Sequence, residues 1–359
     1  MKFRAISLVV LIVFVAVVSS PVLIPTAEAQ EISDVKVLML ITDYFGWNYF
    51  DAKEIFESWG VNVTTIANSL DVDVPSCTNR PPRGTTADIL LNQVENDVIT
   101  QFDILFIPAG GQWLSLSQSP RVLEFVQYAH DSGVIVATIC IGNKVLARAN
   151  DIVNGSCVVS YTNTNSDMTD AGATIRYGHL AVTDNRFVTG GTGGGPSGGG
   201  YEVAPTAEVC MAAVREALGL SHCSTVNITP TSGAVRTNFT ITAEITDLDT
   251  ELGSISAVNS NISEVNARIY TKHNRTLIDA IELVDDDDDG LFSGEFMGLS
   301  SGEYAVDIEI VDTNNTLEIV RDSASFSVGV SFTIDPLTLG IIATSALLAM
   351  VVIIAIKKR

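Results

Sequence analysis

Positive charge is scarce in this chain, and so is histidine. The chain has 42 acidic residues but only 20 lysines and arginines and 4 histidines, which gives a formal net charge of −22. Binding to nucleic acid depends on basic patches that neutralise phosphates, so this balance argues against a nucleic-acid partner. A strongly acidic surface stays solvated and attracts cations.

Long apolar runs occur only at the two ends of the chain. Residues 1–29 have a basic start, an apolar middle and the small-residue site PTAEA, which is typical of a secretory signal peptide. Residues 336–356 form a second uncharged run of about the 20 residues that cross a bilayer as a helix. The basic residues 357–359 follow it and would remain in the cytoplasm. We therefore expect a single-pass cell-membrane protein whose remaining domains are extracellular.

The segment between these runs has the features of an exported glycoprotein. It contains 5 cysteines, an odd number that leaves at least one thiol unpaired within the chain in an oxidising compartment. If Cys140 is that thiol, the other four cysteines allow three pairings, and Cys210 with Cys223 is a local bridge that the spacing permits. Glycosylation sequons begin at Asn62, Asn154, Asn227, Asn238, Asn261, Asn274 and Asn314.

Two domains with different periodicities follow the signal peptide. Residues 30–222 alternate Val/Ile/Leu-rich strands, such as VKVLMLIT and VIVAT, with helical segments such as SPRVLEFVQYAHDSG. This pattern predicts an α/β domain whose mostly parallel sheet is covered on both faces. Residues 223–333 contain short alternating strands separated by turn residues, which predicts an all-β immunoglobulin-like sandwich that acts as a stalk.

An acidic loop, DDDDDGLFSGEF, lies inside the predicted sandwich. Asp285, Asp287 and Asp289 before a glycine match the opening of a calcium loop, in which alternate carboxylates converge on one cation. An EF-hand needs an acid at loop position twelve, which is Phe296 here, while Glu295 stands one residue earlier. We expect either a calcium site of another loop type, formed by these four carboxylates, or an acidic solvated hairpin.

The stretch VIVATICIGNKVLARA consists of a buried strand, one cysteine and a helix. A strand that ends at a nucleophile and turns sharply into a helix raises the nucleophile above the carboxyl edge of the sheet. Such a turn also leaves backbone N–H groups available nearby. Cys140 stands at this turn, Gly142 permits close approach, and the start of the helix would favour the thiolate.

Three stretches, in this order, resemble the ThiJ/PfpI family of the class I glutamine amidotransferase-like superfamily: FDILFIPAGG, VIVATICIGNKVLARA and SYTNTNSDMTDAGATIRYGHLAVTDNRFVTGG. The resemblance covers about residues 35–218 and implies a flavodoxin-like three-layer sandwich. It also implies that Cys140 is the elbow thiol, beside an oxyanion pocket of backbone N–H groups near Gly110, Gly111 and Ile141. Members of the family include peptidases, glyoxalases, deglycases and chaperones, and many of them dimerise, so a homodimer is one expectation.

The chain departs from the family at the partners of the cysteine. The family usually has a glutamate after the first strand, where residues 46–48 of this chain read Gly-Trp-Asn. Protease-like members have a histidine directly after the cysteine, and here that residue is Ile141. Tyr161 and His179 are the candidates for polar assistance, although an ordinary structural role is also open for His179.

Two functions fit these residues. The first is a cysteine-dependent hydrolase or lyase that acts on a small carbonyl compound or adduct, with Cys140 as the nucleophile. The second is a catalytically degenerate surface module that binds a small ligand or a protein through the same pocket, and the absent glutamate and histidine favour it. No cofactor is expected in the α/β domain, because its glycine-rich stretch VTGGTGGGPSGGGYEVAP lacks the lysine of a P-loop.

Overall fold

The computed structural model describes residues 31–75, 80–191, 205–246, 248, 261–298 and 300–329. The predicted signal peptide at 1–29, the predicted membrane span at 336–356 and the tail at 357–359 lie outside these residues. Within the described ranges, no helix combines the length and apolar character needed to cross a bilayer. The membrane location therefore stays a prediction.

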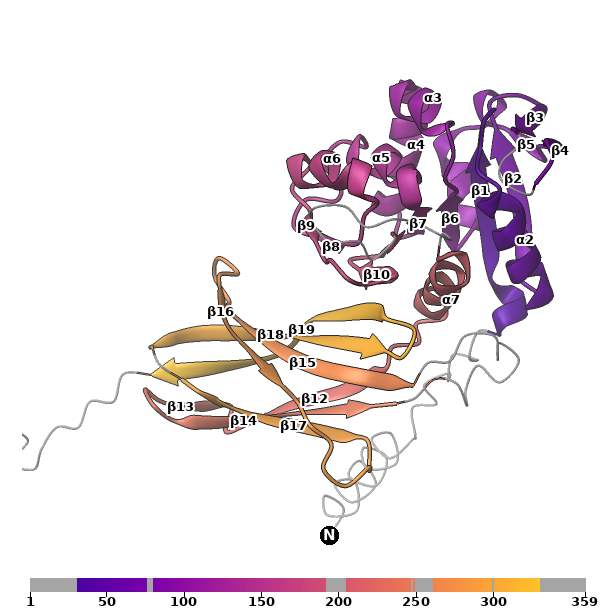
Figure 1. Ribbon diagram of the computed structural model, residues 1–359. Coiled ribbons are helices and arrows are strands. Elements are labelled where there is room, and N and C mark those ends of the chain that lie inside the picture. The colour runs from indigo at the N-terminus through magenta and orange to yellow at the C-terminus, as the bar shows by residue number, and fades with distance from the viewer. Residues whose placement is uncertain are drawn as a thin grey trace, which may run out of the picture. The chain divides into compact units, whose positions relative to one another are not determined.

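A mostly parallel sheet forms the centre of the α/β domain (Figure 1). Its strands are β1 (Lys36–Ile41), β2 (Asn62–Ala67), β5 (Ile89–Leu90), β6 (Ile104–Ile107), β7 (Ile135–Ile139), β10 (Ala181–Asp184) and β11 (Phe187–Gly190). The order across the sheet is β10-β11-β7-β6-β1-β2-β5, and only the β10–β11 hairpin is antiparallel. The predicted flavodoxin-like α/β domain with a mostly parallel sheet is confirmed.

Helices cover both faces of this sheet. They are α2 (Asn48–Ser58), α3 (Trp113–Gln118), α4 (Pro120–Asp131), α5 (Asn143–Ala147), α6 (Asn165–Asp170) and α7 (Thr206–Ala217). Alternate residues of β1 enter two separate cores: Met39 packs in the core shared with α2 and α7, and Leu40 in the core shared with α4 and α5. This division into two cores explains why the strand is apolar at nearly every position.

Short elements complete the α/β domain. Two small ladders lie apart from the main sheet. Their strands are β3 (Asp71–Val74) with β4 (Arg83–Thr86), and β8 (Cys157–Val158) with β9 (Thr174–Ile175). The 3₁₀ turns are η1 (Ile32–Asp34), η2 (Leu91–Gln93), η3 (Asn96–Gln101), η4 (Cys140–Gly142) and η5 (Thr162–Thr164).

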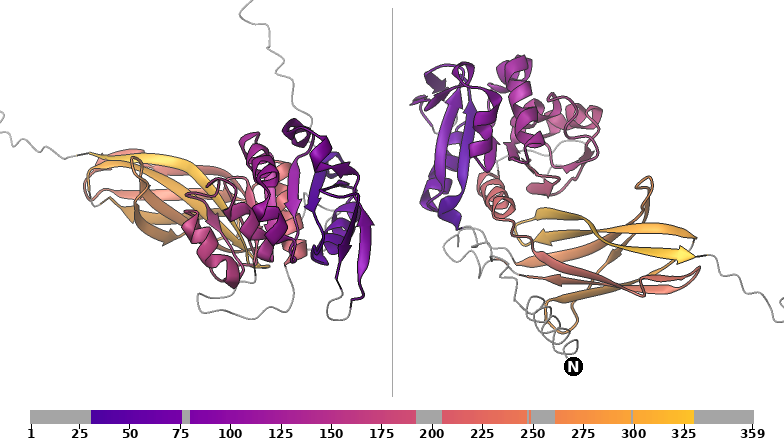
Figure 2. Two further views of the ribbon diagram at one scale, coloured as in Figure 1. Left: turned by 90° about the horizontal axis from the view of Figure 1, so that it is seen from above. Right: turned by 180° about the vertical axis from the view of Figure 1, so that it is seen from behind.

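The rest of the described chain is β-rich, as the sequence predicts. Its strands are β12 (Cys223–Thr229), β13 (Ser232–Ala234), β14 (Asn238–Ile245), β15 (Ile262–Thr271), β16 (Leu277–Glu282), β17 (Leu291–Met297), β18 (Gly302–Asp312) and β19 (Thr316–Gly329). One sheet has the order β12-β14-β17, and the other has the order β16-β15-β18-β19, with β13 parallel to β19. The two sheets lie face to face (Figure 2), and Phe239, Phe296 and Phe326 pack in the core that they share.

Strand β19 also pairs with the sheet of the α/β domain. Residues Thr316, Leu317 and Glu318 pair in parallel with residues 181–183 of β10, while the rest of β19 pairs with β18. The β-rich region is therefore attached by a hydrogen-bonded ladder as well as by the chain connection. We call this junction the seam; the sequence pattern gave no sign of it.

The predicted Cys210–Cys223 bridge is wrong, because neither cysteine forms a disulfide. Cys210 lies on α7 and is buried in the core of the α/β domain, whereas Cys223 begins β12 and packs in the core of the β-rich region. Their separation of thirteen residues thus crosses from one core to another. Burial raises the pKa of the Cys210 thiol well above its usual value and raises that of Cys223 to about 11.

Candidate functional site

Cys140 stands at a strained turn at the carboxyl end of β7. The strand ends at Ile139, and the 3₁₀ turn Cys140–Gly142 leads directly into α5. The φ angle of Cys140 is 59°, in the left-handed region that costs a residue with a Cβ about 1–2 kcal/mol. The side chain is half-buried and packs against the core under α2 and α7. The backbone therefore holds this thiol in a conformation that an unconstrained cysteine would avoid.

Loops from three neighbouring strands meet at this edge of the sheet. After β1, the N–H of Gly46 donates to the carbonyl of Ala109, which follows β6, over 2.7 Å. Gly110 has a φ of 106°, and a Cβ there would lie 2.3 Å from the nitrogen of Gly46. A Cβ at Gly142 would lie 3.0 Å from the carbonyl oxygen of Ile107. The structure thus brings the loop of Gly110 and Gly111 close to the turn of Cys140 and Ile141.

A buried glutamine, which the sequence analysis did not single out, ties the first two loops together. Gln112 is 1% exposed. Its Oε1 accepts from the N–H of Thr42 at 2.9 Å, and its Nε2 donates to the carbonyl of Pro108 at 2.8 Å. This one side chain connects the end of β1 to the loop that follows β6. A polar residue directly after the Gly-Gly pair is the signal that could have identified it.

A buried asparagine has the same role on the other side of the cysteine. Asn143 is fully buried, and its Oδ1 accepts from the hydroxyl of Thr138 at 2.6 Å. Its Nδ2 donates to the carbonyls of Val159 at 3.0 Å and Gly190 at 3.4 Å. The side chain thereby connects β7, the start of α5, β11 and the segment after β8. In the sequence, this residue is recognisable only as the beginning of a helix.

Asn48 lies in the region where the resemblance leads one to expect a glutamate. It is the first residue of α2 and is 7% exposed. Neither Nδ2 nor Oδ1 has a hydrogen-bond partner within the described part of the chain. Its Oδ1 lies beside Gly46, 2.6 Å from where a Cβ would stand, and Gly46 contacts the Ala109 backbone. A neutral amide thus lies in the region in which the resemblance leads one to expect a carboxylate.

The two candidates for polar assistance lie at the same edge of the sheet, beside different strands. Tyr161 follows β8, and Gly191 follows β11. The two segments are in close contact, since a Cβ on Gly191 would lie 2.8 Å from the carbonyl oxygen of Ser160, the residue before Tyr161. Tyr161 is therefore on the same edge of the sheet as the cysteine turn. His179 precedes β10, which β11 separates from β7.

The neighbours of His179 belong to the seam. Burial, followed by the charge of Arg176, lowers the pKa of His179, while a hydrogen bond with Asn315 opposes that shift. The charges of Glu309 and Glu264, both in the β-rich region, also act on it. The described neighbours of His179 are therefore groups of the seam.

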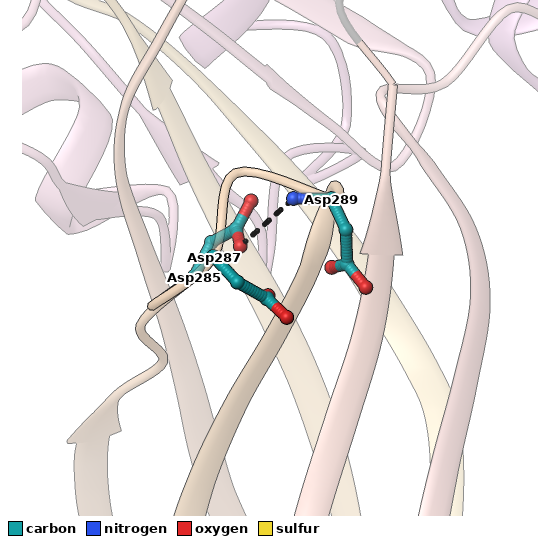
Figure 3. A group of neighbouring side chains, drawn as sticks. All are labelled: Asp285, Asp287 and Asp289. Carbon is teal, nitrogen blue, oxygen red and sulfur yellow. Dashed lines mark hydrogen bonds between the residues drawn. The ribbon is translucent and has the colours of Figure 1, made fainter.

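Three of the four predicted metal ligands converge in the acidic loop. One oxygen from each of Asp285, Asp287 and Asp289 lies within 4.8 Å of the others (Figure 3). Asp285 also accepts from the N–H of Asp289 at 3.2 Å, and the charge of Asp289, ahead of that of Asp285, raises the pKa of Asp287. Glu295 lies on β17, where it accepts from Nδ2 of Asn238 at 2.6 Å, and it is not part of this group.

The fold and this edge define a flavodoxin-like α/β domain with a cysteine at a strand-to-helix turn. Residues 35–196 match the sequence model of the DJ-1/PfpI family. Residues 35–196 therefore form a DJ-1/PfpI domain, and the predicted resemblance is confirmed for the α/β domain. A comparison with curated proteins gives no match.

Several solved structures are similar to about half of the chain. A ThiJ/PfpI domain protein from Brachyspira murdochii is 21% identical with a TM-score of 0.42, over 54% of this chain and 100% of that one. DJ-1beta from Drosophila melanogaster is 19% identical with a TM-score of 0.41, over 52% of this chain and 91% of that one. A protein described as putative protease I from Bacteroides thetaiotaomicron is 16% identical with a TM-score of 0.41, over 51% of this chain and 99% of that one.

Proposed function

We propose that the DJ-1/PfpI domain acts on a small carbonyl compound or adduct as a cysteine-dependent hydrolase or lyase, with Cys140 as the nucleophile. The observation that carries this proposal is the positive φ of Cys140 at the edge where three loops meet. Strained backbone at a half-buried reactive group is typical of a functional site. Cys157 has no comparable turn, and Cys210 and Cys223 are buried in hydrophobic cores.

The proposed step is the addition of the thiol to the carbonyl group. The sulfur of Cys140 forms a bond to the carbonyl carbon, the π electron pair moves to the oxygen, and the thiol proton ends on that oxygen. In this proposal, the backbone N–H groups of Gly110, Gly111 and Ile141 bind the oxygen while it carries negative charge. Gln112 and Asn143 support this arrangement because their hydrogen bonds fix the loops that carry those groups.

A ligand-binding module without catalysis is the second candidate, and Asn48 is the observation that favours it. A neutral amide cannot take the thiol proton, and a nucleophilic cysteine needs a base or a lowered pKa.

Consumption of a small carbonyl compound tests the two candidates against each other. Phenylglyoxal is incubated with the full-length chain, with Cys140→Ala and with Cys157→Ala. The enzyme proposal predicts turnover by the wild type and by Cys157→Ala, and loss of turnover in Cys140→Ala. Saturable binding that Cys140→Ala retains, without consumption by any of the three proteins, would favour the binding module instead.

We further propose that the β-rich region is an immunoglobulin-like sandwich. The orders β12-β14-β17 and β16-β15-β18-β19 correspond to strands A-B-E and C′-C-F-G of that architecture. Tyr304, near the start of β18, donates its hydroxyl to the carbonyl of Ser300 at 2.9 Å, which matches the tyrosine corner before strand F.

The proposed location is the outer face of the cell membrane, held by one C-terminal helix. Support comes from the apolar runs at 1–29 and 336–356 and from the sequons. Protease added to intact cells should remove the DJ-1/PfpI domain and leave a C-terminal epitope tag protected inside. Protection of both ends would contradict the proposed orientation.

A further inference from the structure

A cleft lined by arginines lies at the seam, apart from Cys140. Its volume is about 530 Å³. Residues of the DJ-1/PfpI domain line one side, among them Cys157 and Arg176, and residues of the β-rich region line the other. Arg176, Arg268, Arg275 and Arg321 all line this space, and no acidic residue is among the lining residues. In a chain with a net charge of −22, this convergence of positive groups is unusual.

The carboxylates that pair with these arginines lie behind them. The side chains of Asp184, Asp307 and Glu309 are 0%, 3% and 5% exposed. The guanidinium groups are nearer to the opening, since the four arginine side chains are 18% to 33% exposed. A fourth carboxylate partner, Asp322, is 68% exposed to solvent. Four guanidinium groups thus pair with four carboxylates, three of which are buried, so the positive groups are nearer to the cleft than these three negative ones.

The ion pairs hold the guanidinium groups in place without using all of their donors. Arg176 makes a two-bond contact with Glu309, in which Nη2 donates to Oε2 at 2.7 Å. Arg321 donates from Nε and Nη2 to Asp184, both at 2.5 Å. Each guanidinium has five N–H groups in a fixed plane, so these bonds leave donors over at each arginine. Binding then requires little ordering of side chains, because their positions are already fixed.

The remaining two arginines extend the positive wall along the β-rich side. Arg268 donates from Nε to the hydroxyl of Tyr270 at 3.1 Å. Arg275 donates to the buried Asp307 and, from Nη1, to the exposed Asp322 at 2.6 Å. Each of the four guanidinium groups has a buried carboxylate partner, since Arg268 also pairs with Glu309. Arg275 has an additional, exposed partner in Asp322, which an incoming anion can replace.

We propose that this cleft binds a small anion through a phosphate or carboxylate group. Planar guanidinium groups bind both kinds of oxyanion through paired hydrogen bonds. The exposed Leu277 on β16 and the ring of Tyr270 provide an apolar rim for the uncharged part of such a ligand. The site is independent of the Cys140 proposal, so either can fail without the other.

Protection of Cys157 from alkylation tests this site in the full-length chain. N-ethylmaleimide labelling of Cys157 and Cys140 is followed by peptide mass spectrometry with inorganic phosphate, succinate or potassium chloride at equal ionic strength. We expect phosphate or succinate to slow labelling of Cys157 saturably, while labelling of Cys140 is unchanged. The anion that protects at the lower concentration identifies the preferred group. No protection by either anion beyond the chloride control overturns the proposal.

A matched pair of variants locates the effect. Leu277→Glu places a carboxylate on the rim of the cleft, and Leu291→Glu places one at a similarly exposed leucine elsewhere, since the two residues are 42% and 45% exposed. The added charge in Leu277→Glu should weaken anion binding about tenfold, and Leu291→Glu should bind as the wild type does. Equal protection of Cys157 in both variants would contradict binding in this cleft.

Discussion

At the scale of single residues, the site depends on side chains that fix the backbone more than on side chains that carry charge. Gln112 and Asn143 are buried and bond to main-chain groups of the loops beside Cys140. Asn48 adds an amide without a described partner. The result is a cysteine in a strained backbone conformation, in a chain that has a neutral amide in the region of the expected glutamate.

The strain at Cys140 predicts that activity and stability conflict at this residue. Cys140→Gly removes the thiol and relieves the left-handed strain, whereas Cys140→Ala removes the thiol and keeps the strain. The glycine variant should therefore be more stable than the alanine variant by about 1 kcal/mol in urea denaturation. An alanine variant as stable as the glycine variant would show that the turn is not strained.

Asn143 should matter for stability more than its place in a short helix suggests. Asn143→Ala leaves the hydroxyl of Thr138 and the carbonyl of Val159 without their partner in a buried environment. We expect the free energy of unfolding to fall by about 1–3 kcal/mol. The exposed Asn163, whose Nδ2 reaches only the hydroxyl of Tyr161, provides the control, and Asn163→Ala should change stability by less than about 0.5 kcal/mol. Similar losses in both variants would contradict the role given to Asn143.

At the scale of elements, two segments hold carboxylates close to other charged groups: the acidic hairpin before β17, and strand β19. The hairpin concentrates carboxylates that repel one another. Strand β19 crosses from one sheet to the other and carries Glu318 into the seam. For both elements, we expect stability to depend on the charge of these carboxylates.

Asp287→Asn should have opposite effects with and without calcium. Without the ion, the change removes like-charge repulsion from Asp289 and Asp285 and should raise the melting temperature. In millimolar calcium, the wild type should gain melting temperature and Asp287→Asn should gain less, because a ligand is lost. Asp286→Asn, outside the converging group, is the control for net charge. If calcium leaves the wild type unchanged, the loop is a solvated acidic hairpin.

Glu318 should make stability depend on acid pH. Its carboxylate accepts from the N–H of His222 at 3.2 Å and contacts Nδ1 of the same residue at 2.7 Å. Burial acts to raise the pKa of Glu318, but the hydrogen bond and charge of His222 outweigh it and lower that pKa. In acid, the unfolded chain then binds more protons than the folded chain does. The stabilisation by the Glu318 carboxylate is therefore fully present above the ordinary glutamate pKa of about 4.3, and it is lost as the pH falls below that pKa.

The variant Glu318→Gln isolates this contribution. It should reduce the free energy of unfolding by about 1–3 kcal/mol at neutral pH. The free energy of unfolding of the variant should also decrease less steeply than that of the wild type as the pH is lowered. Glu303→Gln removes an exposed glutamate of β18 and should leave the acid dependence unchanged. Urea denaturation across the acid range measures both, and equal slopes for the wild type and Glu318→Gln would contradict the prediction.

At the scale of the whole molecule, the sequence predicts local order well and long-range pairing poorly. Continuous apolar strands and intervening helices predicted the α/β domain, because burial on both faces requires that composition. The turn at Cys140 was predicted for the same reason, since a buried strand ends there at a cysteine and a glycine. The pairing of β10 with β19 was not predicted, because edge pairing depends on backbone groups that every sequence shares.

The parts of the site that sequence analysis missed share a physical cause. Arg176 and Arg321 are far apart in the chain, and only the seam brings them to one cleft. The residues around Asn143 indicate a helix, but its side chain forms hydrogen bonds to the distant carbonyls of Val159 and Gly190, which the sequence does not reveal. His179 was a candidate because no histidine follows Cys140 directly, and the fold places it beside Arg176.

The rate at which Cys140 is alkylated across pH tests the central claim most directly. In the full-length chain, iodoacetamide labelling of Cys140 and Cys157 is measured by peptide mass spectrometry. The account predicts that Cys140 reacts rapidly at neutral pH with a pKa below the free-cysteine value of about 8.5. Cys157 should react slowly, because burial and then the charge of Asp184 raise its pKa. A pKa of Cys140 at or above 8.5 with slow alkylation would contradict its role as the nucleophile.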